Sequence, residues 1–126
     1  MAEAHERSTR KSTGGRYKRN SKRKKRDLVG KFAATSKGEL KTTDRKSRGF
    51  TDKKMLKSAD EVSVSKPDGE TVKAEIEDVV ENPANPDFVR RDILTKGAVV
   101  STSEGRVEIT SRPGQDGALN GKLLED

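Results

Sequence analysis

Cysteine is absent from this 126-residue sequence, and histidine occurs once, as His5. The lack of cysteine excludes disulfides, thiolate metal ligands and a cysteine nucleophile, and it fits a reducing compartment. A single histidine excludes a two-histidine zinc site. Because His5 lies in a charged segment, we interpret it as a solvated side chain. We therefore expect no metal, no cofactor and no catalytic residue.

Hydrophobic residues are also scarce, at 28% of the chain against 39% charged residues. No apolar run approaches the roughly 20 residues that span a bilayer. No apolar segment follows the basic start, so we expect no secretory signal. The chain shows neither an acylation motif nor an apolar helical face, which argues against a membrane partner. Nothing in the sequence indicates a small-molecule substrate.

What the chain has in excess is positive charge, and that charge is unevenly placed. Residues 1–63 carry 20 basic and 8 acidic side chains, a net charge of +12. Residues 64–126 carry 8 basic and 13 acidic side chains, a net charge of −5. This asymmetry indicates a basic arm joined to a mildly acidic body, a layout common among proteins that bind polyanions.

The basic charge is densest in residues 7–26, which read RSTRKSTGGRYKRNSKRKKR. Eleven of these twenty residues are Lys or Arg, and none is acidic. Residues 1–26 contain almost no apolar surface beyond Met1 and Tyr17, so burial cannot offset the entropy of ordering the backbone. We predict a first domain at 1–26 that is disordered when free and ordered by an external partner.

The chemistry of this arm favours nucleic acid. Lys and Arg neutralise phosphates and release counterions, and Arg adds forked contacts and stacking. Gly14 and Gly15 allow close backbone approach or a sharp turn. The hydroxyls of Ser8 and Thr13 can donate to phosphate, and the ring of Tyr17 can stack on a base. We predict RNA contacts from these residues and from the cations that follow, which are Lys18, Arg19, Lys22, Arg23, Lys24, Lys25 and Arg26.

The second predicted domain, residues 27–126, has the pattern of a small all-β barrel. Short alternating segments are separated by turn signals such as Pro67-Asp68-Gly69 and the Asn-Pro pairs of residues 82–86. Within 31–60 the strands are less certain. The pieces 32–35 and 40–43 tolerate a strand, whereas 51–61 fits a helical turn or a strand. We predict further strands at 61–65, 70–80, 88–95, 98–103 and 106–111, and a short one within 118–126.

One acidic cluster in the body admits an enzymatic interpretation. Glu75 and Glu77 share a face of their predicted strand, opposite Ile76, and Asp78 and Glu81 lie nearby. A hydrolase or nuclease would need such carboxylates, but a solvated face explains them more simply. The STGGR segment lacks the glycine pattern and the strand–helix context of a nucleotide loop. We therefore predict that the protein is not an enzyme.

Four blocks of the sequence resemble one family in the same order. They are residues 7–30, the DVVENPANPDFVRRDILTKGAVV stretch at 78–100, the EGRVEITSRPGQDG stretch at 104–117, and the short hydrophobic end. The chain is similar to the archaeal and eukaryotic small-subunit ribosomal protein number eight, the e-type family, and its short length is like that of archaeal members. Family members often have Gln-Gly where this chain has His5-Glu6.

The resemblance implies a β-barrel with a long basic extension that contacts small-subunit ribosomal RNA. It implies a structural constituent of the ribosome, a cytoplasmic ribonucleoprotein particle, that supports assembly and translation beside neighbouring ribosomal proteins. The RNA-binding positions that it implies are Arg7, Ser8, Arg10, Lys11, Thr13, Gly14, Gly15 and Arg16 in the arm, and Arg90, Arg91, Lys96, Arg112, Gly114 and Gln115 in the body.

Two alternatives remain open from the sequence. A ribosome-biogenesis factor shares the family's body, and a free nucleic-acid-binding protein of chromatin type would have a similar arm. The KRKKR run at 22–26 also matches a nuclear localisation signal, a pattern that any RNA-binding arm produces.

Overall fold

The computed structural model describes residues 6–125, and the expectation for His5 lies outside this range. Contacts divide the chain into two units, Met1–Phe32 and Ala33–Asp126, and each is described by itself. In the described part of the first unit, the regular element is the 3-10 turn η1, Lys25–Asp27. The predicted limit of the RNA-binding arm at residue 26 stays a prediction.

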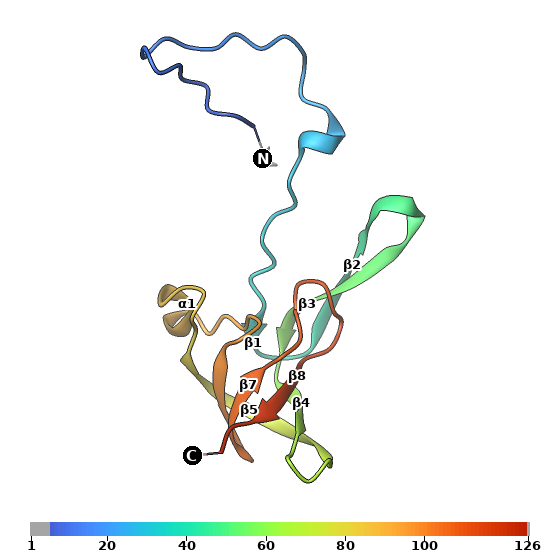
Figure 1. Ribbon diagram of the computed structural model, residues 1–126. Helices are drawn as coiled ribbons and strands as arrows, with labels where there is room; N and C mark the ends of the chain where they lie inside the picture. Colours follow the sequence, from blue (N-terminus) through green and yellow to red (C-terminus); the bar gives the residue numbers. More distant parts are fainter. Residues whose placement is uncertain (1–5, 126) are drawn as a thin grey trace. The chain divides into compact units, whose positions relative to one another are not determined.

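The second unit is built on a closed five-stranded barrel (Figure 1). Its strands are β4 (Glu61–Ser65), β5 (Thr71–Glu81), β6 (Val99–Thr102), β7 (Gly105–Ile109) and β8 (Asn120–Leu123). Consecutive strands pair antiparallel, and β8 closes the barrel by pairing parallel with β4. The predicted all-β barrel is therefore confirmed.

The barrel follows the period-two alternation of its strands. Val62 and Val64 of β4 and Ala74 and Ile76 of β5 point inward and are at most 5% exposed. Alternate residues such as Glu75 are exposed on the outside, as a pleated strand requires. The apolar residues of the barrel strands thus form one core.

A second, three-stranded sheet has the order β1 (Ser36–Lys37), β3 (Asp52–Ala59), β2 (Lys41–Lys46). Most of the ambiguous stretch at 51–61 is therefore the strand β3, outside the barrel sheet, and its last residue, Glu61, begins the barrel strand β4. Leu56 and Ala59 of β3 nevertheless join the barrel core. The piece 32–35, which the sequence only tolerates as a strand, is not one, and in the second unit strand pairing begins at Ser36, with Ser58. The short segment η2, Arg48–Phe50, connects β2 and β3, and its Gly49 has a non-helical φ of 80° and ψ of 20°.

The strand expected at 88–95 is also wrong, since the helix α1, Asp87–Arg90, occupies its first half. Pro86 already has a helical conformation, with a φ of −61° and a ψ of −26°. The side chain of Asn85 accepts a hydrogen bond from the backbone N of Asp87 at 2.9 Å, an Asx turn that leads the chain into the helix. Asp92 then adopts a left-handed φ of 52° and ends the helix. Ile93 keeps a single bridge, to Ser36.

No helix among residues 6–125 is both long and apolar enough to cross a membrane.

Candidate nucleic-acid interface

The Gly-Gly pair of the arm forms a tight hairpin turn. The backbone N of Gly14 donates to Lys11 O at 3.0 Å, and Lys11 N donates to Gly15 O at 2.8 Å. Gly14 has a φ of +85°, and a Cβ built there would meet nothing within 4 Å. The demand for glycine is therefore conformational, as in a three-residue hairpin loop that ends in a left-handed residue. The expected sharp turn is present, whereas close approach to phosphate stays a prediction.

This turn brings two arginines opposite one another. Arg10 and Arg16 form an antiparallel bridge, and Tyr17 N donates to Thr9 O at 2.8 Å. Side chains directly opposite in a bridge lie on the same face, where like charges repel. The guanidinium of Arg10 is partly satisfied by Gly14 O at 3.0 Å. An anion beside this pair would relieve the remaining repulsion.

The ring of Tyr17 lies among cations. The Arg7 guanidinium carbon is 4.2 Å from the ring centroid, and Lys11 Nζ is 5.6 Å from it. Both distances are within the range of cation–π attraction. Since 42% of Tyr17 is exposed, part of its surface remains accessible to a base.

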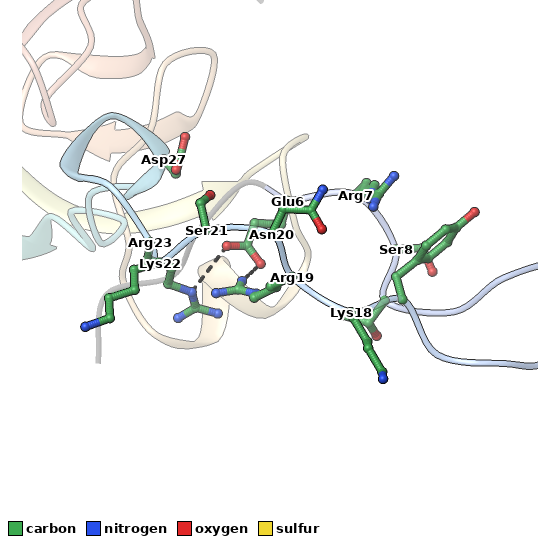
Figure 2. A pocket seen from close by; sticks show the side chains of 12 residues that line it. Glu6, Arg7, Ser8, Lys18, Arg19, Asn20, Ser21, Lys22, Arg23 and Asp27 are labelled. Carbon is green, nitrogen blue, oxygen red and sulfur yellow. Dashed lines mark hydrogen bonds and ion pairs between the residues drawn. The ribbon is translucent and has the colours of Figure 1, made fainter.

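Glu6, which the sequence did not indicate as a site residue, pairs with two arginines of the arm (Figure 2). Its Oε1 accepts a hydrogen bond from Arg23 Nε at 3.3 Å, and its Oε2 forms an ion pair with Arg19. A hollow of about 250 Å³ lies beside these groups, lined by residues 6–9, 17–23 and Asp27. The sequence signal for this contact was the acidic residue that directly precedes the basic run.

The barrel topology gathers the remaining predicted residues at one end. Because consecutive strands run antiparallel, the β5–β6 connection (82–98) and the β7–β8 connection (110–119) emerge at the same end. We call this the loop end. The first connection carries Arg90, Arg91 and Lys96, and the second carries Arg112, Gly114 and Gln115; all are exposed except the half-buried Gly114. Two blocks distant in sequence thus share one end of the fold.

A buried asparagine holds the first of these connections. Asn82 is 5% exposed, and its Nδ2 donates to Ile93 O at 3.1 Å. Its Oδ1 accepts from Ala84 N at 3.1 Å and from Thr95 Oγ1 at 3.0 Å. These three hydrogen bonds tie both ends of the loop to one side chain, so the loop has a defined path.

Lys96 lies at the apex of the turn that leads into β6. Ala98 N donates to Thr95 O at 3.1 Å, and Gly97 has a φ of +86°. This is the geometry of a type II turn, which needs glycine at its third position. Arg90 lies on α1, where its guanidinium is 3.2 Å from the Asp87 carboxylate.

The second connection is fixed to β3. Leu56 N donates to Pro113 O at 2.9 Å, and Lys53 Nζ donates to Gln115 Oε1 at 3.4 Å. Within the loop, the Asp116 carboxylate accepts from Arg112 N at 3.1 Å. The side chains of Arg112 and Gln115 are exposed on this anchored loop.

The opposite end of the barrel has the other sign of charge. Its connections, 66–70 and 103–104, hold one basic and three acidic residues, against four basic and three acidic residues at the loop end. Lys66 Nζ lies 2.7 Å from Glu104 Oε2. The hydrogen bond to Glu104 and its charge raise the pKa of Lys66 above the ordinary 10.5. The one cation at this end is therefore matched by a carboxylate.

The acidic cluster of β5 lies on the outside of the barrel. Glu75 and Glu77 are exposed on the outer face, and Ser101 Oγ donates to Glu77 at 3.3 Å. Within residues 6–125, no group of three or more His, Cys, Asp or Glu residues is placed to hold a metal ion. The geometry therefore fits the solvated face that the sequence favoured.

Comparison with known proteins now identifies the family. The model of the family described as Ribosomal protein S8e matches residues 4–124. The chain is 51% identical to the small ribosomal subunit protein eS8 of Haloarcula marismortui, over 94% of this chain and 96% of that protein. It is 45% identical to the protein of the same name from Nanoarchaeum equitans, over 94% of each chain. It is 40% identical to that of Methanobrevibacter smithii, over 98% of this chain and all of that one. The chain belongs to the ribosomal protein S8e family, in its archaeal-type form.

Proposed function

We propose that this protein binds ribosomal RNA of the small subunit through its basic arm, residues 7–26, and through the loop end of its barrel. The family is one of structural ribosomal proteins, so the chain is a constituent of the cytoplasmic ribosome and not an enzyme. Its relatives are named as small-subunit proteins, which supports ribosomal RNA and other ribosomal proteins as partners.

One observation carries the RNA-binding proposal. Every side chain from residue 7 to residue 26 is exposed, and eleven of them are Lys or Arg with no acid among them. A cationic segment that buries none of its own side chains needs an external polyanion to offset its self-repulsion. This self-repulsion is concentrated at Arg10 and Arg16, which lie directly opposite one another.

The two parts of the proposed interface differ in kind. The arm supplies a high density of charge with a hairpin at Gly14 and an aromatic ring at Tyr17. The loop end supplies fewer cations on loops that Asn82 and Pro113 hold in place. We assign the arm most of the affinity and the loop end the register of the barrel on the RNA, because fixed contacts determine position.

The salt dependence of binding tests this assignment. If about eight arm cations meet phosphates, log K against log salt has a slope near −6 on single-strand-like RNA, at roughly −0.7 per contact. The full chain with Arg7→Gln, Arg10→Gln and Arg16→Gln should lose about two units of slope on small-subunit ribosomal RNA. A matched control removes three exposed cations of the barrel wall through Lys73→Gln, Arg106→Gln and Lys122→Gln.

The slope measured for the control should differ from that of the unsubstituted chain by no more than about half of the roughly 0.7 that one phosphate contact contributes. Equal slopes for the arm variant and the unsubstituted chain would contradict the proposal, since phosphate contacts would then come from elsewhere.

Sedimentation separates the ribosomal constituent from a free nucleic-acid-binding protein. The protein should travel with small subunits in a sucrose gradient, and its confinement to ribosome-free fractions would argue for the alternative.

A further inference from the structure

The tip of the β2–β3 hairpin presents a phenylalanine to solvent. Phe50 is 101% exposed, the most exposed large hydrophobic residue in the described chain. Its backbone is left-handed, with a φ of +62°, directly after Gly49 at +80°. A bulky residue rarely takes this conformation, which costs about 1–2 kcal/mol. Retained strain together with full exposure points to a role in an interaction.

The loop that carries Phe50 is a closed structure. Ser47 N donates to Thr51 O at 2.8 Å, and Ser47 Oγ donates to the same oxygen at 2.8 Å. The two hydroxyls of Ser47 and Thr51 lie 2.6 Å apart. These bonds clamp the base of the Arg48–Phe50 turn, so the ring is held at the tip. Figure 1 shows the β2–β3 ribbon extending beyond the barrel strands.

The hairpin is basic on a body that is otherwise acidic. Residues 41–57 hold seven basic and two acidic side chains, a net charge of +5. The rest of the second unit, 33–40 and 58–126, holds nine basic and sixteen acidic side chains, a net charge of −7. Charge of this sign, concentrated on one projecting element, is complementary to a polyanion.

The strand register leaves part of this charge unbalanced. Asp44 is opposite Lys54, and Lys46 is opposite Asp52, so on one face each of these lysines has a residue of opposite charge across from it in the strand register. Arg45 is opposite Lys53, which places two exposed cations side by side on the other face. Like charges at directly opposite positions repel, and a phosphate between them would remove that repulsion.

We propose that the β2–β3 hairpin is a second RNA-binding element, in which Phe50 stacks on an unpaired base while Arg45, Arg48 and Lys53 contact the flanking phosphates. This inference rests on the proposed function, because it assigns a further contact with the same RNA. An exposed ring beside cations is the arrangement with which proteins hold unpaired nucleotides. The hairpin is also continuous with the loop end, since Lys53 bonds to Gln115.

A tryptophan at position 50 provides the test, because the chain contains no other. Phe50→Trp keeps a stacking ring, whereas Phe50→Leu keeps an apolar side chain without a ring. Against small-subunit ribosomal RNA, Phe50→Leu should bind about 5- to 100-fold more weakly, and Phe50→Trp should bind about as tightly as the unsubstituted chain. Phe32→Leu is the matched control, since Phe32 is also exposed, at 63%, and should change affinity little.

Fluorescence distinguishes stacking from docking in an apolar protein pocket. Emission of the Phe50→Trp chain should be quenched on adding the RNA alone, because stacking on a base quenches indole. Equal RNA affinity of Phe50→Leu and the unsubstituted chain, or an unquenched tryptophan, would overturn the inference. So would a Phe50→Leu chain that binds RNA normally but fails to enter small subunits, since the tip would then contact a protein.

The experiments test RNA binding by the arm and RNA binding by the β2–β3 hairpin independently of one another. Phe50 is uncharged, so its replacement should weaken binding at every salt concentration and leave the salt slope unchanged. The arm variant changes that slope. An effect of the arm variant without any effect of Phe50→Leu would overturn only the hairpin contact, and the reverse result would overturn only the arm assignment.

Discussion

The carboxylate of Glu6 accepts a hydrogen bond from Arg23 Nε at 3.3 Å, across seventeen positions of the sequence. The same carboxylate pairs with Arg19. An internal acid therefore occupies two guanidiniums that the proposed function assigns to phosphate. The acid and the RNA compete for the same donors.

The first prediction removes that competitor. Glu6→Gln should raise the affinity for small-subunit ribosomal RNA about two- to fivefold, since an exposed ion pair is worth at most about 1 kcal/mol. Titration at fixed salt measures the change. Glu108→Gln, which breaks the 3.0 Å pair with Lys122 on the barrel wall, should have no such effect. Weaker binding by Glu6→Gln would show that the ion pairs prepare the arm for RNA.

The second prediction concerns the arm turn. Gly14→Val places a β-branched residue at a φ of +85°, and the left-handed conformation then costs about 1–2 kcal/mol. RNA affinity should fall about 5- to 30-fold, in line with that cost. Gly14→Asn should lose less, because asparagine tolerates this region.

Gly15→Ala is the control for the turn. A Cβ at Gly15 would lie 3.7 Å from its nearest neighbour, so the methyl group fits. The hairpin would be irrelevant to binding if Gly14→Val and Gly15→Ala bound RNA equally.

The third prediction concerns the barrel itself. A Cβ on Gly121 would lie 2.4 Å from Val107 Cγ1 and 2.9 Å from the backbone O of Glu108. Gly121→Ala should destabilise the fold by about 1–3 kcal/mol through overpacking between β8 and β7. Thermal unfolding should show a Tm lower by roughly 4–8 °C for each kcal/mol. Gly114→Ala, with 3.4 Å to its nearest neighbour, should change the Tm much less.

The fourth prediction concerns the buried Asn82, which holds the β5–β6 connection in place. Asn82→Leu removes three hydrogen bonds and leaves Ile93 O and Thr95 without their partner. The free energy of unfolding should fall by about 1–3 kcal/mol, as it does when a buried polar group loses its partner. Denaturant unfolding measures it. Asn120→Ala is a suitable control, since this exposed residue bonds through its backbone. If the denaturant midpoint of Asn82→Leu equalled that of the unsubstituted chain, the hydrogen bonds of Asn82 would not be what stabilises the β5–β6 connection.

The fifth prediction concerns the order of the arm. Amides of residues 7–26 should exchange with solvent quickly in the free protein and become protected when RNA is added, because every side chain there is exposed. Hydrogen exchange followed by mass spectrometry reports both states. Slow exchange in the free protein would show that the arm is ordered without RNA.

The barrel strands were predictable because their inward residues alternate. Val62 with Val64, and Ala74 with Ile76, carry a period of two that only a half-buried strand explains. The strand predicted at 88–95 was wrong for a local reason. Phe88 and Val89 have apolar, strand-favouring side chains, but the Asx turn at Asn85 leads the chain into a helical turn first.

The sequence did not predict the features of the structure that depend on pairing between distant segments. β3 has polar residues on both faces along most of its length, so no alternation revealed whether it was a strand or which sheet it joined. Phe50 was one phenylalanine among polar neighbours until its backbone and exposure were known. The contact of Glu6 with Arg23 depends on the turn at Gly14, which folds the arm back along itself.

The antiparallel course of the barrel also decides where the protein tolerates foreign chain. Connections alternate between the two ends, so the Pro67-Asp68-Gly69 turn emerges opposite the loop end. Residues 67–69 are exposed, and two backbone hydrogen bonds close the turn, from Lys66 N to Glu70 O and from Gly69 N to Lys66 O. A fluorophore or affinity tag inserted there would project away from both loops of the proposed interface. This turn is therefore a suitable labelling site for following the protein as it enters an assembling particle.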